Sequence, residues 1–427
     1  MLVTLAGTNT PLRASPGDAT PEVICAAYAR ISRSPLPVHE LRARARDDLP
    51  KTRAFTERIV YHLGHESVAE HAVFNLDILG ISRLVTEIVE HSRLASYTER
   101  SQRYICLGED FLIPHEAREL GFSKSFGDLV RQQHAVYRAA AKRLSASGDS
   151  RAAKEDARYA LGLATTTQLG LTANARALAS MLARLETGPL HEARTLGNRI
   201  RRLVARVAPA LIPAKSPSEA PVETMGINGL SPWVVSADAP ALVWHTPEPE
   251  QAVRDALQFC GGKFWQPRPV ADGASALTVL PRAFEAVQLA FVVVVSASAF
   301  AQLKRHRMAS ILAQPYDPAL GLTIPPTVEA AGMAREFEEL ASRSTEMRVA
   351  MAKDHPAAGA YGLLNAHRRR VLLVINARAF HQMARLRLDH HAQWDIRRQV
   401  GLMTDELRAR LPSLARLLSV PEGETAD

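Results

Sequence analysis

The chain has 427 residues, of which 47% are hydrophobic and 22% charged. This composition is typical of a folded domain and too apolar for a disordered chain, and the length allows two domains. The longest nearly uncharged apolar run, Leu289–Ala301, is shorter than the roughly 20 residues that a bilayer requires, so no membrane segment is expected. The first residues lack a basic patch followed by an apolar stretch, and we therefore expect a cytoplasmic protein.

The formal net charge is +8, and most of the basic residues are arginines. Guanidinium groups suit phosphate and carboxylate oxygens, so the charge favours anionic ligands. The alternative of a nucleic-acid partner is not expected, because no lysine-rich run occurs and the basic clusters lie inside apolar segments. The three cysteines, Cys25, Cys106 and Cys260, show no paired spacing, which argues against a disulfide framework or a zinc finger.

In chain order, the sequence predicts helices over much of 37–64, 118–146 and 151–208, and later over 328–354 and 360–412. Two strands are expected before basic motifs. In the segment HAVFNLDILG, Phe74, Leu76 and Ile78 alternate with polar residues, which predicts a half-buried strand. The later segment AVQLAFVVVV has no polar alternation and predicts a strand buried on both faces.

The chain contains two internal copies of one pattern. His91-Ser92-Arg93-Leu94-Ala95-Ser96 matches Arg305-His306-Arg307-Met308-Ala309-Ser310, and the NAR helix beginning near Asn174 matches that near Asn376. The order of strand, basic motif, polar helices and NAR helix is the same in both, which indicates a duplication. We predict domains over 1–212 and 234–427, joined by a linker over 213–233 that is rich in Pro, Ser and Gly. The fold class expected is α+β, with helices on an antiparallel sheet in each domain.

Several motifs carry a resemblance to one family. The chain contains HESVAEH at 65–71, SYTERSQRY at 96–104, RHRMAS at 305–310 and NARAFHQMARLRLDHHAQWDIR at 376–397. In these motifs it resembles the flavin-dependent thymidylate synthases, arranged as a tandem duplication. The last motif is nearly complete and highly specific.

Each copy departs from the family pattern where the other keeps it. The first copy has His91 and Ser92 in place of Arg-His, whereas the second has Ala313, Pro315 and Asp317 in place of the loop residues Glu99, Ser101 and Arg103. Arg158 corresponds to Ala360. Because family members are homotetramers whose sites combine several subunits, the resemblance implies a homodimer that forms a pseudo-tetramer, with two of four ancestral sites retained.

The resemblance also implies roles for individual residues. Ser101 and Arg387 are the expected catalytic residues, with the Ser101 hydroxyl orienting the nucleotide ring. The expected substrate-binding residues are Glu99, Arg103, Arg158, Gln302 and Arg387. The expected cofactor-binding residues are His65, Ser67, Arg93, Arg305, His306, Arg307, Asn376, Arg378 and His391. The implied cofactor is FAD, the implied substrate is dUMP or a related pyrimidine nucleotide, and NADPH and methylenetetrahydrofolate are the implied co-substrates. This chemistry requires no cysteine nucleophile.

Other interpretations remain open at this point. The chain could be a degenerate flavin- or nucleotide-binding homologue, or an enzyme that methylates another uridine nucleotide. Singly, an Arg-His-Arg triplet indicates a solvated helix start, and His65 and His71 fit hydrogen-bonded core histidines equally well. Arg368–Arg370 fit a solvated turn, and Trp394 fits a core residue. No metal is expected at His390 and His391, because adjacent side chains on a helix point apart and no carboxylate completes a triad.

Overall fold

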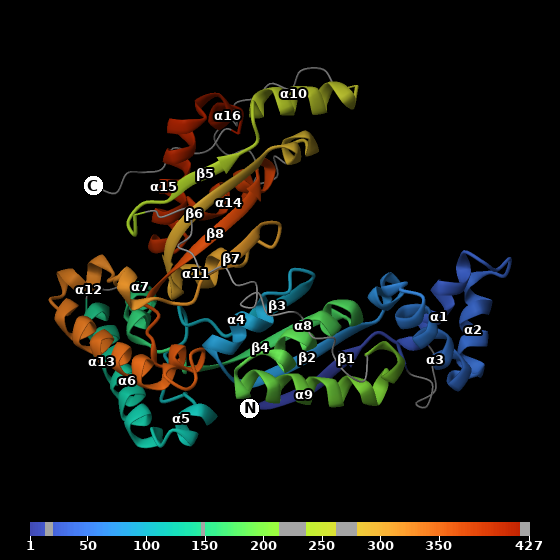
Figure 1. Cartoon of the computed structure of the whole chain (residues 1–427), viewed down its shortest axis with the longest axis horizontal. Coiled ribbons are helices and arrows are strands. Elements are labelled where there is room, and N and C mark those ends of the chain that lie inside the picture. The colour runs from blue at the N-terminus through green and yellow to red at the C-terminus, as the bar shows by residue number, and fades with distance from the viewer. Residues whose placement is uncertain (13–19, 147–149, 213–235, 262–279, 419–427) are drawn as a thin grey trace.

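The computed structural model describes residues 1–12, 20–146, 150–212, 236–261 and 280–418. It contains two four-stranded antiparallel sheets with the same strand order, β1-β2-β4-β3 and β5-β6-β8-β7 (Figure 1). The first sheet consists of β1 (Leu2–Thr8), β2 (Val73–Ser82), β3 (Ala95–Glu99) and β4 (Thr166–Asn174). The second consists of β5 (Ala241–His245), β6 (Gln288–Ser296), β7 (Ser310–Ala313) and β8 (Arg368–Asn376). The α+β prediction is confirmed, whereas the linker predicted over 213–233 lies outside the described residues.

The central strands have the burial that their sequences predict. Along β2, Phe74, Leu76 and Ile78 are buried, and the intervening Asn75 and Asp77 are exposed. Along β6, every residue after Gln288 is buried. The alternating burial along β2 means that one face of the first sheet packs on the core and the other faces solvent. The continuous burial along β6 means that this strand is covered on both faces.

The predicted helices over 151–208 and 360–412 are wrong in part, because each contains a strand. In β4, Thr167, Leu169, Leu171 and Ala173 are buried in alternation, which is a strand period inside an otherwise helical segment. In β8 the alternation begins only after three arginines. The expectation of a solvated turn at Arg368–Arg370 is also wrong, because these residues begin β8.

Helices cover one face of each sheet. In the first copy, α8 (Ala175–Thr187) and α9 (His191–Val207) share one core with β2 and β4, and α4 (Arg83–Glu90) follows β2. In the second copy, α14 (Ala377–Arg387), α15 (Trp394–Arg410) and α16 (Pro412–Leu417) share a core with β6 and β8, and α11 (Ala297–Leu303) follows β6. Each basic motif therefore lies between the short helix that follows a central strand and the next strand, β3 or β7.

The remaining helices lie at the ends of the sheets and between the copies. The first copy adds α1 (Glu22–Ile31), α2 (Val38–Asp47), α3 (Leu49–Glu57), a π-helical turn (Arg58–His62), a 3-10 helix (Glu66–His71), α5 (His115–Glu119), α6 (Ser123–Ser145) and α7 (Ser150–Ala157). The second copy adds α10 (Pro249–Phe259), α12 (Pro326–Ala330) and α13 (Ala334–Ala352). Short 3-10 helices cover Arg158–Ala160, Pro209–Leu211, Arg282–Ala286, Pro318–Leu320 and Ala358–Gly362. Among the helices of the described ranges, none is long and apolar enough to cross a membrane.

The two copies pack against each other around an internal pseudo-twofold axis. Gly162 and Leu364, which lie equally far before the two NAR motifs, form a β-bridge with each other. The Leu163 amide donates to the Leu363 carbonyl at 2.8 Å, and the symmetry-related Asn365 amide donates to the Leu161 carbonyl at 2.8 Å. Such a reciprocal pattern is characteristic of an isologous interface.

Side chains extend this interface into a continuous core. One apolar cluster joins Tyr137 and Ala140 of α6 to Phe337 and Leu340 of α13, so helices of different copies lie side by side (Figure 1). Lys304 Nζ pairs with Glu90 Oε2 at 2.7 Å, and both side chains are largely buried. The two copies therefore form one packed body within a single chain.

Candidate functional site

Basic side chains from both copies meet at the interface between them. Arg103 follows β3, and Arg158 precedes β4 in the first copy. Gln302 and His306 lie at and after the end of α11, and Arg387 ends α14 in the second copy. We call these five residues the composite cluster. The Ser101 loop and the Arg387 helix, which are far apart in sequence, are thus brought to one region of the molecule.

Arg387 is held by polar groups that carry no negative charge. Its Nε donates to His306 Nε2 at 3.0 Å, and its two Nη atoms lie 3.4 Å from Gln302 Oε1 and 3.2 Å from the Gln302 carbonyl oxygen. Burial, together with the nearby Arg305 and Arg103 guanidinium groups, lowers the pKa of Arg387 to about 10. Within the described ranges, no carboxylate lies at salt-bridge distance from Arg387, so the site favours an anion.

His306 accepts a hydrogen bond, which fixes its protonation state. Because Arg387 Nε donates to His306 Nε2, that nitrogen carries no proton, and the neutral ring holds its proton on Nδ1. Burial, and then the charges of Arg387 and Arg305, lower the pKa of His306 to about 3. The ring is therefore a neutral imidazole at physiological pH.

Arg103 and Arg158 both contact Glu155, Arg103 through the side-chain carboxylate and Arg158 through the backbone carbonyl. Arg103 Nε forms an ion pair with the Glu155 carboxylate, and its Nη2 donates to the His391 carbonyl at 3.3 Å. Arg158 is fully enclosed, and its Nε donates to the Glu155 carbonyl oxygen at 3.1 Å. Burial lowers the pKa of Arg158, and among the described residues no carboxylate forms a salt bridge with it. Arg158 is thus a buried cation and Arg387 a partly buried one, and neither forms a salt bridge with a carboxylate of the described residues.

Two other predicted nucleotide-contacting residues lie beside Arg103. Ser101 Oγ accepts a hydrogen bond from the Arg103 amide at 3.2 Å, which shapes the loop that follows β3. The Glu99 carboxylate forms an ion pair with Arg83, and both side chains are about nine-tenths buried. Glu99 is thus already partnered, and its expected contact with substrate stays a prediction.

A separate pocket in the first copy contains two of the predicted cofactor residues. It has a volume of about 710 Å³ and lies among α1, α2, α3 and the segment after them, with His65 and Ser67 in its wall. Four basic residues and one acidic residue line it, namely Arg30, Arg33, Arg44, Lys51 and Asp48. The second copy contributes no described residue to this wall, so the pocket and the composite cluster are distinct places on one chain.

The remaining basic-motif residues lie near the axis between the copies. Arg307 Nη1 donates to the Arg93 and Ala95 carbonyl oxygens of the opposite copy. Arg305 is exposed, and its Nε donates to the Ala301 carbonyl at 3.2 Å. Arg93 is exposed as well. The second-copy triplet is therefore anchored on the first copy by Arg307, while Arg305 extends toward solvent.

Asn376 and Arg378 have structural partners at the start of α14. The Asn376 side chain caps the helix by accepting from the Ala379 amide at 2.8 Å, as Asn174 does for α8 at 2.8 Å. Arg378 donates to the Leu280 carbonyl at 2.8 Å and to Glu285 at 2.7 Å. Helix capping explains the Asn of both NAR motifs without a cofactor.

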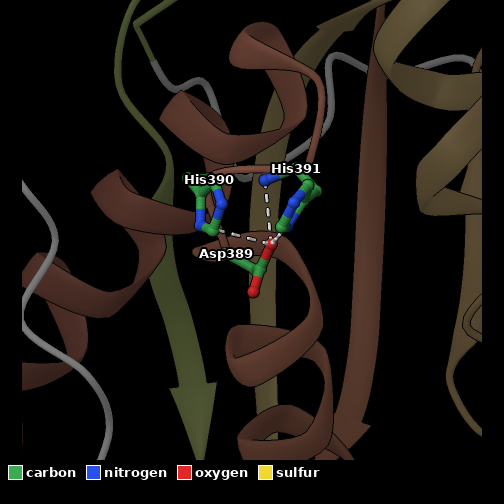
Figure 2. A group of neighbouring side chains, drawn as sticks. All are labelled: Asp389, His390 and His391. Atoms are coloured by element: carbon green, nitrogen blue, oxygen red, sulfur yellow. Dashed lines mark hydrogen bonds and ion pairs between the residues drawn. The ribbon is translucent and has the colours of Figure 1, made fainter.

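His391 lies in an exposed turn with a second histidine and an aspartate (Figure 2). The expected helical separation of His390 and His391 is wrong, because α14 ends at Arg387 and both rings turn toward the Asp389 carboxylate. Asp389 Oδ1 lies 2.8 Å from His391 Nδ1 and 3.9 Å from His390 Nδ1. The three ligand atoms lie within 4.8 Å of one another, so a carboxylate does complete a triad here. The group is exposed, and Arg103 and Arg397 donate to the two histidine carbonyl groups, which disfavours a cation.

Sequence reasoning missed the residues that support this site through tertiary contacts. Tyr159 donates to the buried Asp395 at 2.9 Å, and Trp394 Nε1 donates to Asp156 at 2.8 Å, each bond joining the two copies. Trp394 also stacks on Tyr159, with ring centroids 5.8 Å apart, so it is a partly buried interface residue. Asp156 lies in none of the motifs, and Asp395 lies in the motif at 376–397, but only the fold shows that each binds a residue of the other copy.

Together, the observations define a protein of two similar α+β copies, with a cluster between them in which Arg158 and Arg387 have no salt-bridge partner among the described residues. The chain belongs to the family described as thymidylate synthase complementing protein, whose model matches residues 17–210 and 241–413. Both copies are therefore members of the family, as the sequence motifs indicated.

Individual relatives agree with this assignment. The chain is 31% identical over 210 residues to a flavin-dependent thymidylate synthase of Clostridium tetani, covering 46% of this chain and 83% of that protein. It is 34% identical over 194 residues to the enzyme of the same name from Geobacter sulfurreducens, covering 45% and 80%. A UPF0159 protein of Thermoplasma acidophilum is 22% identical over 447 residues, covering 85% of this chain and 88% of the relative. The last similarity extends through both copies.

Proposed function

We propose that the chain is a flavin-dependent thymidylate synthase that methylates dUMP to dTMP, with methylenetetrahydrofolate as carbon donor and NADPH as reductant. The observation that carries the proposal is a pair of arginines from different copies, the buried Arg158 and the partly buried Arg387, neither of which has a salt-bridge partner among the described residues. A nucleotide phosphate supplies the missing negative charge, and guanidinium forks bind phosphate oxygens in pairs.

Each cluster residue has a role in this proposal. Arg103, Arg158 and Arg387 hold the phosphate and the ring oxygens, and the Ser101 hydroxyl orients the pyrimidine ring. Gln302, whose Nε2 is buried without a partner, donates to the base. His306 keeps Arg387 in place as a neutral acceptor and leaves its Nδ1 proton for the cofactor side. Fixed donors aimed at developing negative charge stabilise a transition state because they require no reorganisation.

The residues present fit a flavin dinucleotide. The first-copy pocket of about 710 Å³ is within the size range of cofactor sites, and its basic wall suits a diphosphate. His65 and Ser67 would hold the diphosphate end of the cofactor, and Arg305, His306 and Arg307 would border its ring system. Bound reduced flavin would supply the hydride. Because the pocket and the cluster are separate on one chain, a homodimer that brings one chain's pocket to the other chain's cluster would complete each site.

The cysteines support a route without a thiolate nucleophile. Burial raises the pKa of Cys25 to about 12, which disfavours its thiolate. Cys106 and Cys260 are exposed, and neither is a member of the composite cluster. The flavin-dependent route needs no covalent attachment of the nucleotide to cysteine, and this distinguishes it from the thiolate-dependent alternative.

A degenerate binding protein is the second candidate function. It is favoured by Arg103, whose charge is already neutralised by Glu155, and by Asn376, whose oxygen is occupied as a helix cap. Such a protein would retain flavin or nucleotide without turnover.

The test begins with purified full-length protein. An active enzyme should be yellow, should change its visible spectrum on addition of dUMP, and should form dTMP when methylenetetrahydrofolate and NADPH are supplied. It should also restore growth of a thymidine-requiring host. Bound flavin without dTMP formation or rescue would favour the degenerate protein, and absence of both flavin and dUMP binding would reject the proposal.

A further inference from the structure

The composite cluster and the residues linked to it contain buried hydrogen-bond donors that have no acceptor. Among the described buried side-chain atoms that have no hydrogen-bond partner, four belong to the cluster or to residues linked to it, namely Gln102 Nε2, Arg158 Nη2, Gln302 Nε2 and Ser298 Oγ. Their residues are between 3% and 5% exposed. Three of the four atoms can only donate, so this region has an excess of donors over acceptors. Buried polar atoms are normally paired, and an unpaired group at such a depth calls for an explanation.

Hydrogen bonds connect Gln102, Arg158 and Ser298 through Asn365, across the two copies. Asn365 Nδ2 donates to Gln102 Oε1 at 3.1 Å and to the Arg158 carbonyl at 2.9 Å. The Ser298 amide donates to the Asn365 carbonyl at 3.2 Å. Ser298 and Gln302 are four residues apart in α11 and lie on the same face of that helix. The unpaired donors are therefore neighbours in one region.

Asn365 fixes the orientation of the Gln102 side chain. Because Gln102 Oε1 accepts from Asn365, the Nε2 group must point to the opposite side of the amide. Gln102 lies between Ser101 and Arg103, on the loop that follows β3 and carries two predicted nucleotide contacts. A buried amide held in this way presents a preorganised donor, and a ligand oxygen would satisfy it without further ordering.

We infer that Gln102 is a further ligand-binding residue, whose Nε2 donates to an oxygen of the bound pyrimidine nucleotide, and that Asn365 is its positioning residue. The inference rests on the proposed function for the identity of the ligand. The chemistry required is an acceptor oxygen, which the nucleotide offers both as a base carbonyl and as a phosphate oxygen.

The test compares full-length wild type with Gln102→Met, which keeps the length of the side chain and removes the donor. Binding of dUMP, deoxyuridine and inorganic phosphate is measured by calorimetry. We expect Gln102→Met to weaken dUMP binding about tenfold, the scale of one lost hydrogen bond in a charged site. Gln102→Asn, which retains a shorter amide, should lose less. A parallel loss for deoxyuridine assigns the contact to the base or sugar, and a loss for dUMP and phosphate alone assigns it to the phosphate.

Gln133→Met is the matched control. Gln133 is a buried amide elsewhere in the interface, and its Nε2 already donates to Ser344 Oγ and the Gly362 carbonyl. This variant should lower the melting temperature and leave dUMP affinity unchanged. If Gln102→Met retains both wild-type dUMP affinity and wild-type phosphate affinity, the inference is wrong while the proposed function stands. If wild type binds phosphate in a Gln102-dependent way but not dUMP, the proposed function fails and the donor assignment holds. If wild type binds neither probe, both fail.

Discussion

Arg387 is the residue on which nucleotide binding should depend most strongly. Its guanidinium group lies partly buried among uncharged acceptors and other cations, so removing it deletes a charge-assisted bond to the ligand. We predict that Arg387→Ala weakens dUMP binding by about 1.5–3 kcal/mol, measured by calorimetry. Arg387→Lys should also be weak, because an ammonium group cannot reproduce the fork. Arg410→Ala, at an exposed position at the end of α15, is the control, and unchanged affinity in Arg387→Ala would remove this arginine from the site.

His306 should make the folded protein sensitive to acid. Its pKa is about 3 in the folded state and near 6.5 when unfolded, so the unfolded chain binds more protons between these values. The free energy of unfolding should therefore fall as pH decreases from 6.5 toward 3, and the His306 contribution is fully present above pH 6.5. The unfolded wild type binds up to about one proton more at His306 than the folded protein does. His306→Gln removes this difference in proton binding, so the free energy of unfolding measured in urea should depend less on pH. An identical pH profile in the variant would show that His306 is not held neutral.

Site residues could be predicted from the sequence where they lie in a recognisable motif. They could not be predicted where their role depends on a contact with a residue far away in the sequence. The resemblance to the family indicates Arg103, Arg158, Gln302 and Arg387, and these residues lie in one cluster in the structure. Glu155 and Asn365 were not named, because neither lies in a distinctive motif and each acts through contacts with residues far away in sequence. The capping roles of Asn174 and Asn376 were accessible in principle, since Asn before a helix is a known start signal.

At the level of elements, the equivalent helices α8 and α14 offer a matched pair of caps. Asn174 and Asn376 accept from the Ala177 and Ala379 amides at the same distance, 2.8 Å. We predict that Asn174→Ala and Asn376→Ala each lower the free energy of unfolding by about 1 kcal/mol, as judged by denaturant titration. Asn376→Asp should retain most of this stability. A loss of flavin in Asn376→Ala beyond that in Asn174→Ala would give Asn376 the cofactor role implied by the family.

Strand prediction succeeded or failed according to what surrounded each strand. β2 and β6 were recognised because polar alternation or its absence was clear over the whole strand. β4 and β8 were missed because each leads directly into an NAR helix, and the helical period dominated the combined segment. In β8 the first three residues are arginines, of which Arg369 is buried against Glu87, a partner from the other copy. That pairing with the other copy, together with the bonds of Arg368 to Thr323 and Asp238, accommodates a basic segment in a strand.

In the whole molecule, an ion pair between equivalent positions should hold the copies together. Glu90 and Lys304 each precede the basic motif of their copy, and their side chains are 13% and 10% exposed. Glu90→Lys or Lys304→Glu should lower the free energy of unfolding by about 3–5 kcal/mol, because either leaves like charges facing each other in a largely buried place. The double exchange should recover most of the loss, but not all, since Arg83 and Arg305 also lie near Glu90. Additive losses in the double variant would show that the pair is not coupled.

The chain should hold one nucleotide. The positions equivalent to Ser101 and Arg103 are Pro315 and Asp317, and Arg158 corresponds to Ala360. Between Pro315 and Asp317, the buried Tyr316 donates to Glu87 at 2.6 Å, and Arg369 lies over its ring at 4.1 Å. In the second copy, the loop around Tyr316 is therefore occupied by contacts within the protein, where the first copy has its Ser101 loop. A dUMP titration should therefore end at about one equivalent per chain, and two equivalents of equal affinity would contradict this asymmetry.

The internal twofold axis at Gly162 and Leu364 has a consequence for how this protein can vary. In a homodimer, each position near the axis faces its own copy, and one gene must satisfy both sides with the same amino acid. A covalently joined pair is free of that restriction, which is how an acid and a base can oppose each other at Glu90 and Lys304. The two unlike halves therefore pair favourably, whereas two identical halves would bring like charges together at this position. Two fragments produced by cutting between residues 212 and 236 should accordingly assemble as a mixed pair in preference to either like pair.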